Sequence, residues 1–74
     1  MWQFAIPYPD HTAFVVSYQA RNLAEAFQRF AEESWRQEIG GTVGVWRNGL
    51  LVARVIVFTN RKTKEREPHL QLWR

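Results

Sequence analysis

The run Arg61–Arg66 holds the densest charge in the chain. A basic loop of this kind can lie on the phosphates of a nucleic acid, and each contact then raises the affinity in a salt-dependent way. Glu65 and Glu67 interleave with the cations and weaken this interpretation. The alternative is a solvated loop that keeps the protein soluble. The run supplies four candidate binding residues: Arg61, Lys62, Lys64 and Arg66.

The sequence marks few candidates for proton transfer: Asp10 is the only Asp, and His11 and His69 are the only histidines. Asp10 and His11 are adjacent, but an Asp in a turn bonds back to its own backbone without any catalytic role. His69 near the cations could act as the general base of a metal-free ribonuclease, although no second catalytic group is marked. We therefore predict no catalytic residue.

Metal and phosphate motifs are missing from the sequence. The chain has no cysteine and no histidine pair at metal-ligand spacing. Gly40-Gly41 follows a predicted helix, whereas a phosphate loop precedes one. We expect neither a metal site nor a cofactor.

The chain contains four Trp, five Phe and two Tyr. Trp35 falls at the margin of a predicted helical stripe, and Trp73 is the penultimate residue. Such tryptophans can stack on unpaired bases or anchor a protein partner. The alternative is that they cap the edges of a small core. Trp35 and Trp73 join the candidate binding residues.

Two strands and a helix are predicted for the first half of the chain. Trp2, Phe4 and Ile6 alternate with less apolar residues, and the residues over 14–20 alternate in the same way, so both segments read as strands joined at the 7–11 turn. Asn22 is the predicted N-cap of a helix over 23–39 that ends at Gly40-Gly41. Its apolar stripe comprises Leu23, Ala26, Phe27, Phe30, Ala31 and Ser34. Its opposite face offers two acid-first ion pairs, Glu25 with Arg29 and Glu32 with Arg36.

Three more strands are predicted for the second half. Strands over 42–47 and 50–58 flank Asn48-Gly49, the strongest short hairpin signal. A charged loop over 59–68 precedes a short strand that contains Leu70 and Leu72. The fold class is therefore α+β, a single domain over 1–74 in which one helix packs on a curved antiparallel sheet in the order ββαβββ.

A two-residue turn at Asn48-Gly49 would pair Arg47 with Leu50 and Val45 with Val52. One face of this hairpin then holds Val43, Val45, Leu50, Val52, Ile56 and Phe58. The other holds Trp46, Leu51, Ala53, Val55 and Val57. Both faces are apolar, and a single helix covers only one of them. We assign the first face to the outside because Arg54 would be costly to bury there, and Arg47 and Arg54 join the candidate binding residues. A homodimer through this face is one way to cover it.

Length and composition limit the remaining alternatives. No apolar run reaches the roughly 18 residues of a membrane span, and the first residues lack the pattern of a signal peptide. We expect no membrane partner and a cytoplasmic protein. Charge is divided along the chain: residues 1–45 carry a net −2 and residues 46–74 a net +5.

One resemblance exists at the level of layout. The helix start Asn22–Ala26, the segment Gly41–Val43 and the hairpin Asn48–Leu50 follow one another as in some very small phage-encoded inhibitors, including certain anti-CRISPR proteins. The chain resembles these proteins over residues 20–58. The resemblance implies a non-enzymatic inhibitor in which a sheet curls around one helix and which occludes a surface of a larger complex. It assigns no functional residue.

The leading hypothesis is therefore a small non-enzymatic interaction protein, such as a phage or mobile-element inhibitor of a protein or nucleoprotein complex. The alternative is a nucleic-acid-binding module that uses the basic C-terminal half. A metal-free ribonuclease comes third.

Overall fold

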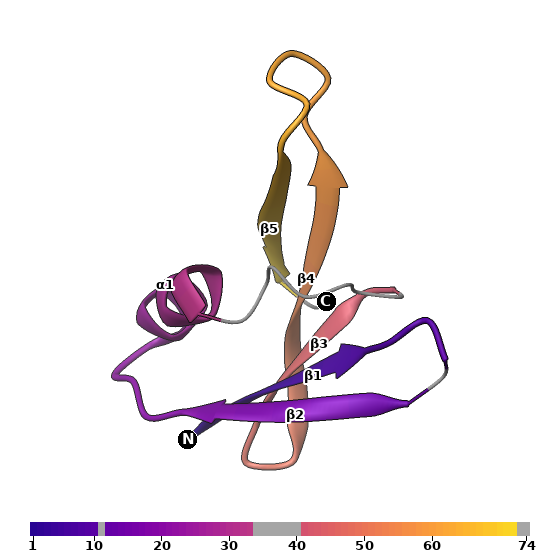
Figure 1. Cartoon of the computed structure of the whole chain (residues 1–74). Coiled ribbons are helices and arrows are strands. Elements are labelled where there is room, and N and C mark those ends of the chain that lie inside the picture. The colour runs from indigo at the N-terminus through magenta and orange to yellow at the C-terminus, as the bar shows by residue number, and fades with distance from the viewer. Residues whose placement is uncertain (11, 34–40, 73–74) are drawn as a thin grey trace.

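The computed structural model describes residues 1–10, 12–33 and 41–72. Their elements, in chain order, are β1 (Trp2–Pro7), β2 (Ala13–Tyr18), α1 (Leu23–Glu33), β3 (Val43–Arg47), β4 (Leu50–Thr59) and β5 (Arg66–Leu72). The strands form an antiparallel sheet in the spatial order β2-β1-β3-β4-β5, with α1 beside it (Figure 1). The predicted α+β class and the order ββαβββ are confirmed.

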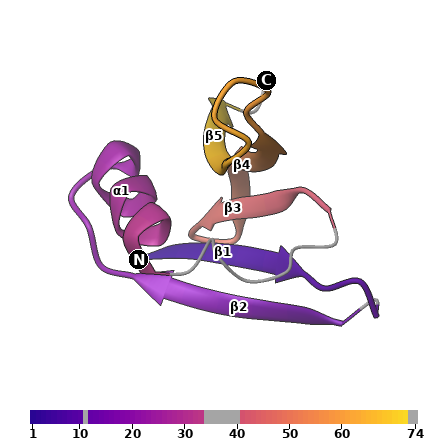
Figure 2. The same cartoon turned by 45° about the horizontal axis from the view of Figure 1, so that its top comes forward.

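Strand direction changes across the sheet. Figures 1 and 2 show β4 and β5 running across the direction of β1 and β2. Neighbouring strands rotate relative to one another because of the right-handed twist of each strand. As a result, the outer part of the β4–β5 hairpin extends away from the rest of the sheet (Figure 1).

The predicted cap begins the helix. Asn22 Oδ1 accepts a hydrogen bond from the Glu25 backbone N–H at 2.9 Å, and the Ala26 N–H donates to the Asn22 carbonyl at 3.1 Å. The Asn22 side chain thus satisfies an N–H that has no partner within the helix. The predicted helix residues 34–39 and Gly40 lie outside the described residues. No helix in the described ranges is long and apolar enough to cross a membrane.

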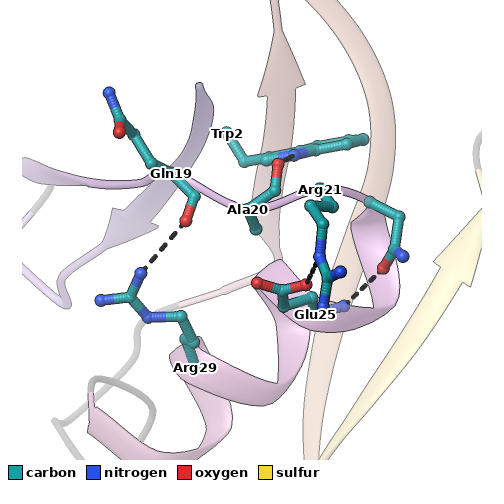
Figure 3. A network of polar contacts seen from close by, with 7 residues as sticks. Trp2, Gln19, Ala20, Arg21, Glu25 and Arg29 are labelled. Carbon is teal, nitrogen blue, oxygen red and sulfur yellow. Dashed lines mark hydrogen bonds and ion pairs between the residues drawn. The ribbon is translucent and has the colours of Figure 1, made fainter.

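Where β2 leads into α1, Glu25 and Arg29 do not form the predicted ion pair with each other. The Glu25 carboxylate contacts Arg21 Nε at 3.3 Å, and Arg29 donates to the Gln19 carbonyl at 3.1 Å (Figure 3). The Arg29 guanidinium also lies 5.3 Å from the centre of the Tyr18 ring. Arg29 therefore ties the helix to the end of β2 instead of pairing along the helix.

The core lies between α1 and the sheet. Phe30 stacks on Phe4, with 4.7 Å between ring centres and 7° between ring planes, and Tyr18 meets Phe4 edge-on at 5.6 Å. Trp2 is 5% exposed and donates its indole N–H to the Ala20 carbonyl at 3.1 Å. The fully buried side chains of the described core are Phe4, Ile6, Ala26, Phe30, Val43, Val45, Ala53 and Val55.

The predicted face assignment of the β3–β4 hairpin is partly wrong. Asn48 and Gly49 have φ values of 51° and 77° and form the expected tight turn, and Arg47 faces Leu50. However, Val45 faces Ala53 instead of Val52, because the register shifts between Val45 and Trp46. The extra residue of such a bulge reverses the alternation of side chains beyond it.

Because of this bulge, two sets of side chains lie on the face opposite to the predicted one. Val43 and Val45, predicted to lie outside, are fully buried. Trp46 and Leu51, predicted under the helix, share the opposite face, where both contact the space a Cβ of Gly44 would occupy, at 3.0 and 3.5 Å. Trp46 is 37% exposed. The prediction holds for Val55, which is buried, and for Arg54, which is exposed.

β4 and β5 are longer than predicted. β4 continues to Thr59 and β5 begins at Arg66, so the loop covers residues 60–65 instead of 59–68. Pro68 lies within β5, opposite Val57. An edge strand accepts proline because one side of its backbone needs no ladder hydrogen bond.

Phe30 and Phe27 provide a matched pair for testing the helix packing. Phe30→Ala should lower the free energy of unfolding by about 3–5 kcal/mol, since it removes a buried ring and leaves a cavity. Phe27 is only half-buried at the margin of the core, so Phe27→Ala should cost clearly less. Urea denaturation of both variants measures the difference. A larger loss for Phe27→Ala would contradict the packing described.

Candidate functional site

We call residues 54–71, the part of the β4–β5 hairpin that runs from Arg54 through the loop and back to Gln71, the basic ribbon. Its strands pair continuously from Arg54 opposite Gln71 to Thr59 opposite Arg66. It ends in the loop 60–65, the part of the molecule that extends farthest from the other strands (Figure 1). The ribbon therefore presents two strands and a tip to the surroundings.

Asn60 organises the tip. Its Oδ1 atom accepts hydrogen bonds from the backbone N–H groups of Lys62 at 2.8 Å and Thr63 at 3.3 Å. Its backbone N–H donates to the Glu65 carbonyl, and its carbonyl accepts from the Lys64 N–H, both at 2.7 Å. Asn side chains stabilise turns in this way by replacing backbone partners. The loop thus has a defined conformation although it is charged.

Four cations gather at this tip. Arg61, Lys62, Lys64 and Arg66 are all exposed. Lys64 has a φ of 60°, a left-handed conformation that residues with side chains seldom adopt. Its backbone is held there by the bond to Asn60. Glu65 is exposed among these cations, while Glu67 accepts a hydrogen bond from Asn60 Nδ2 at 3.3 Å.

Below the tip, the outer face of the ribbon carries an aromatic pair. The Phe58 ring lies 4.3 Å from the His69 ring, measured between centres, with the planes tilted by 35°. Phe58 is 42% exposed. His69 Nε2 lies 3.7 Å from a carboxylate oxygen of Glu67. In the described ranges, no three His, Asp or Glu side chains come together as a metal site would require.

Arg54 lies farther along the same face. Its Nε donates to Gln71 Oε1 at 3.0 Å across the strand pair. Residues on one face of a strand alternate with those on the other, so Arg54, Ile56 and Phe58 share the outer face. The ribbon combines a cationic tip, an aromatic pair and an arginine.

The structure separates the predicted binding residues into three groups. Arg61, Lys62, Lys64 and Arg66 lie together at the tip, and Arg54 lies on the ribbon below them. Arg47 is the last residue of β3 and lies opposite Leu50, at the end of β4 remote from the tip. Its guanidinium lies 4.8 Å from the centre of the Trp2 ring. Trp35 and Trp73 lie outside the described residues.

The Phe58–His69 pair was missed because the fifth strand was predicted to begin too late. With β5 beginning at Arg66, His69 faces Ile56 and becomes the diagonal neighbour of Phe58. The usable signal was the alternation of Glu67, His69 and Gln71 with Pro68, Leu70 and Leu72, which continues the strand pattern through the proline.

The Asp10 side chain stabilises the β1–β2 turn. Its carboxylate accepts hydrogen bonds from the Thr12 hydroxyl at 2.6 Å and from the Thr12 backbone N–H at 3.0 Å. These bonds favour the ionised form and lower the pKa of Asp10 below its ordinary value. The carboxylate serves the β1–β2 turn, and His11 lies outside the described residues.

Comparison of the chain with protein-family models, with curated proteins and with solved structures finds no match.

The role of Asn60 can be tested by hydrogen exchange. Asn60→Ala removes the acceptor of the Lys62 and Thr63 amides, so both should exchange faster, with a stability loss of about 1 kcal/mol. Thr63→Ala is the matched control, because Thr63 Oγ1 accepts only from the Glu65 N–H among the hydrogen bonds of this tip. Unchanged exchange at Lys62 in Asn60→Ala would contradict the described loop.

Proposed function

We propose that this chain is a non-enzymatic binding protein that places its basic ribbon on a phosphate backbone, free or within a nucleoprotein complex. The observation that carries the proposal is the gathering of Arg61, Lys62, Lys64 and Arg66 on a structured tip that extends from the sheet. A cation held on an ordered loop loses less conformational entropy on binding than a cation on a flexible chain segment.

Shape supports the same ligand. A two-stranded antiparallel ribbon fits the major groove of B-DNA, which is about 12 Å wide. Exposed Phe58 and His69 offer rings on which an unpaired base can stack. The Glu67 carboxylate accepts a hydrogen bond from Asn60 Nδ2 and lies 3.7 Å from His69 Nε2, so part of its hydrogen-bonding capacity is used within the ribbon.

A specific observation favours a second candidate, an inhibitor that occludes a protein surface of such a complex. Trp46 and Leu51 gather on the sheet face opposite the helix, the face that also carries Phe58 and Arg54. Exposed aromatic and arginine side chains of this kind dominate protein interfaces. The layout shared with small phage inhibitors belongs to this candidate, together with a sheet curved around α1 and a cytoplasmic site of action.

Salt dependence distinguishes the two candidates. If the four tip cations each contact a phosphate, the logarithm of the binding constant should fall with the logarithm of salt concentration with a slope of about −3 to −4. Fluorescence anisotropy with a labelled duplex and a labelled single strand measures this slope. A protein-surface inhibitor should bind neither oligonucleotide near physiological salt.

Matched single variants locate the contact. Arg61→Gln should reduce the magnitude of the slope by about one, because one phosphate contact is lost. Arg21→Gln removes the same charge at the start of the helix, where the side chain is 91% exposed, and should leave the slope unchanged. Equal effects of both variants would show that only net charge matters and would refute the ribbon as the binding site.

A further inference from the structure

β2 forms an edge of the sheet, and within the described ranges no strand lies on its outer side. Its six residues contain neither a charge nor a proline, and they pair with β1 without a register shift. Phe14 is 48% exposed and Val15 is 53% exposed. An uncharged, regular edge strand with exposed apolar residues is a template for pairing with another strand.

The opposite edge shows the contrast. β5 carries Arg66, Glu67, Pro68 and His69 in succession. Charged residues and proline on an edge strand discourage pairing with another chain. The same sheet thus has one protected edge and one unprotected edge.

The hydrogen-bonding phase of β2 follows from the β1–β2 turn. The Tyr8 N–H donates to the Thr12 carbonyl at 2.8 Å, and Pro7, which has no N–H, faces Ala13. Because bonded and non-bonded pairs alternate in antiparallel strands, Phe14, Val16 and Tyr18 turn their backbone groups toward β1. The outward groups therefore belong to Ala13, Val15 and Ser17.

We infer that β2 pairs antiparallel with β2 of a second copy of this chain, about a two-fold axis through Val15. The two-fold keeps like faces together only if it pairs a residue with its own copy, and Val15 and Val16 are the central residues of β2. The Val15 register is favoured because it places Val15 opposite Val15 of the second copy and Phe14 opposite Val16 of the second copy. Both exposed apolar residues are then covered by apolar neighbours.

Charge favours a second copy as the occupant. Residues 12–20 contain no charged side chain, although the whole chain has a net charge of +3. The cations of the basic ribbon lie at the opposite edge of the sheet. Two copies joined at β2 therefore place these cations at the far ends of the assembly, where their mutual repulsion is weakest.

This interface differs from the dimer face expected from sequence. That face included Val43 and Val45, which are buried within one copy. A six-residue strand pair is small beside the roughly 1,200–2,000 Å² of stable interfaces, so the dimer should be reversible at micromolar concentration. It would carry two basic ribbons, but it stands independently of what the ribbon binds.

Charge-swapped variants test the register. Val15→Lys places two like charges opposite each other across the axis, and so does Val15→Glu, whereas an equal mixture of the two pairs opposite charges. Sedimentation velocity should be measured at about 5 to 500 μM, the range in which so small an interface should associate reversibly. It should show dimers for the wild type and for the mixture. Each variant alone should dimerise at least about tenfold more weakly.

Leu72→Lys is the matched control, because it replaces an apolar residue that is 67% exposed on the β5 edge, and it should leave dimerisation unchanged. Circular dichroism confirms that each variant is folded. A wild type that stays monomeric to the highest concentration overturns the proposal. So does failure of the mixture to dimerise when the wild type does.

Discussion

The stack of Phe30 on Phe4 is the contact on which the rest of the structure depends. Phe4 is flanked in the sheet by Val16 of β2 and Val45 of β3, so the helix is fixed on the part of the sheet where three strands meet. Arg29 ties the helix to the chain just after β2 through the Gln19 carbonyl (Figure 3), and Asn22 caps the first turn of the helix. Apolar burial on this face supplies the main driving force for folding.

Because the helix covers only one face of the sheet near β1, the opposite face and the outer part of the β4–β5 hairpin lie at the surface of the molecule. The outer face keeps Trp46 and Phe58 partly exposed, and the β4–β5 hairpin extends beyond the core. The chain separates these surfaces by charge: the cations concentrate on the ribbon, while β2 at the opposite edge has none. This separation of charge underlies both proposals, an anionic partner for the basic ribbon and a second copy of the chain for the β2 edge.

Local patterns predicted the elements well, because each rested on chemistry within a few residues. Asn22 as a cap and Asn48-Gly49 as a turn needed only their own side chains and backbone preferences. The faces of the β3–β4 hairpin could not be predicted in the same way. The bulge between Val45 and Trp46 is a feature of the pairing between strands, where Phe4 faces Val45 and the Trp46 indole lies next to Gly44. The start of β5 was missed because Pro68 and the charged residues resemble a loop until the pairing with β4 is known.

The most direct test of binding through the basic ribbon is a two-dimensional NMR titration of the ¹⁵N-labelled protein with a short DNA duplex at low salt. We expect chemical-shift changes concentrated in the basic ribbon, at the amides of the 60–65 loop and of Arg54, Phe58 and His69. The amides of α1 and β1 should change little, since they lie in and around the core. Changes centred on the helix, or no change at all, would contradict the assignment of the ribbon as the binding surface.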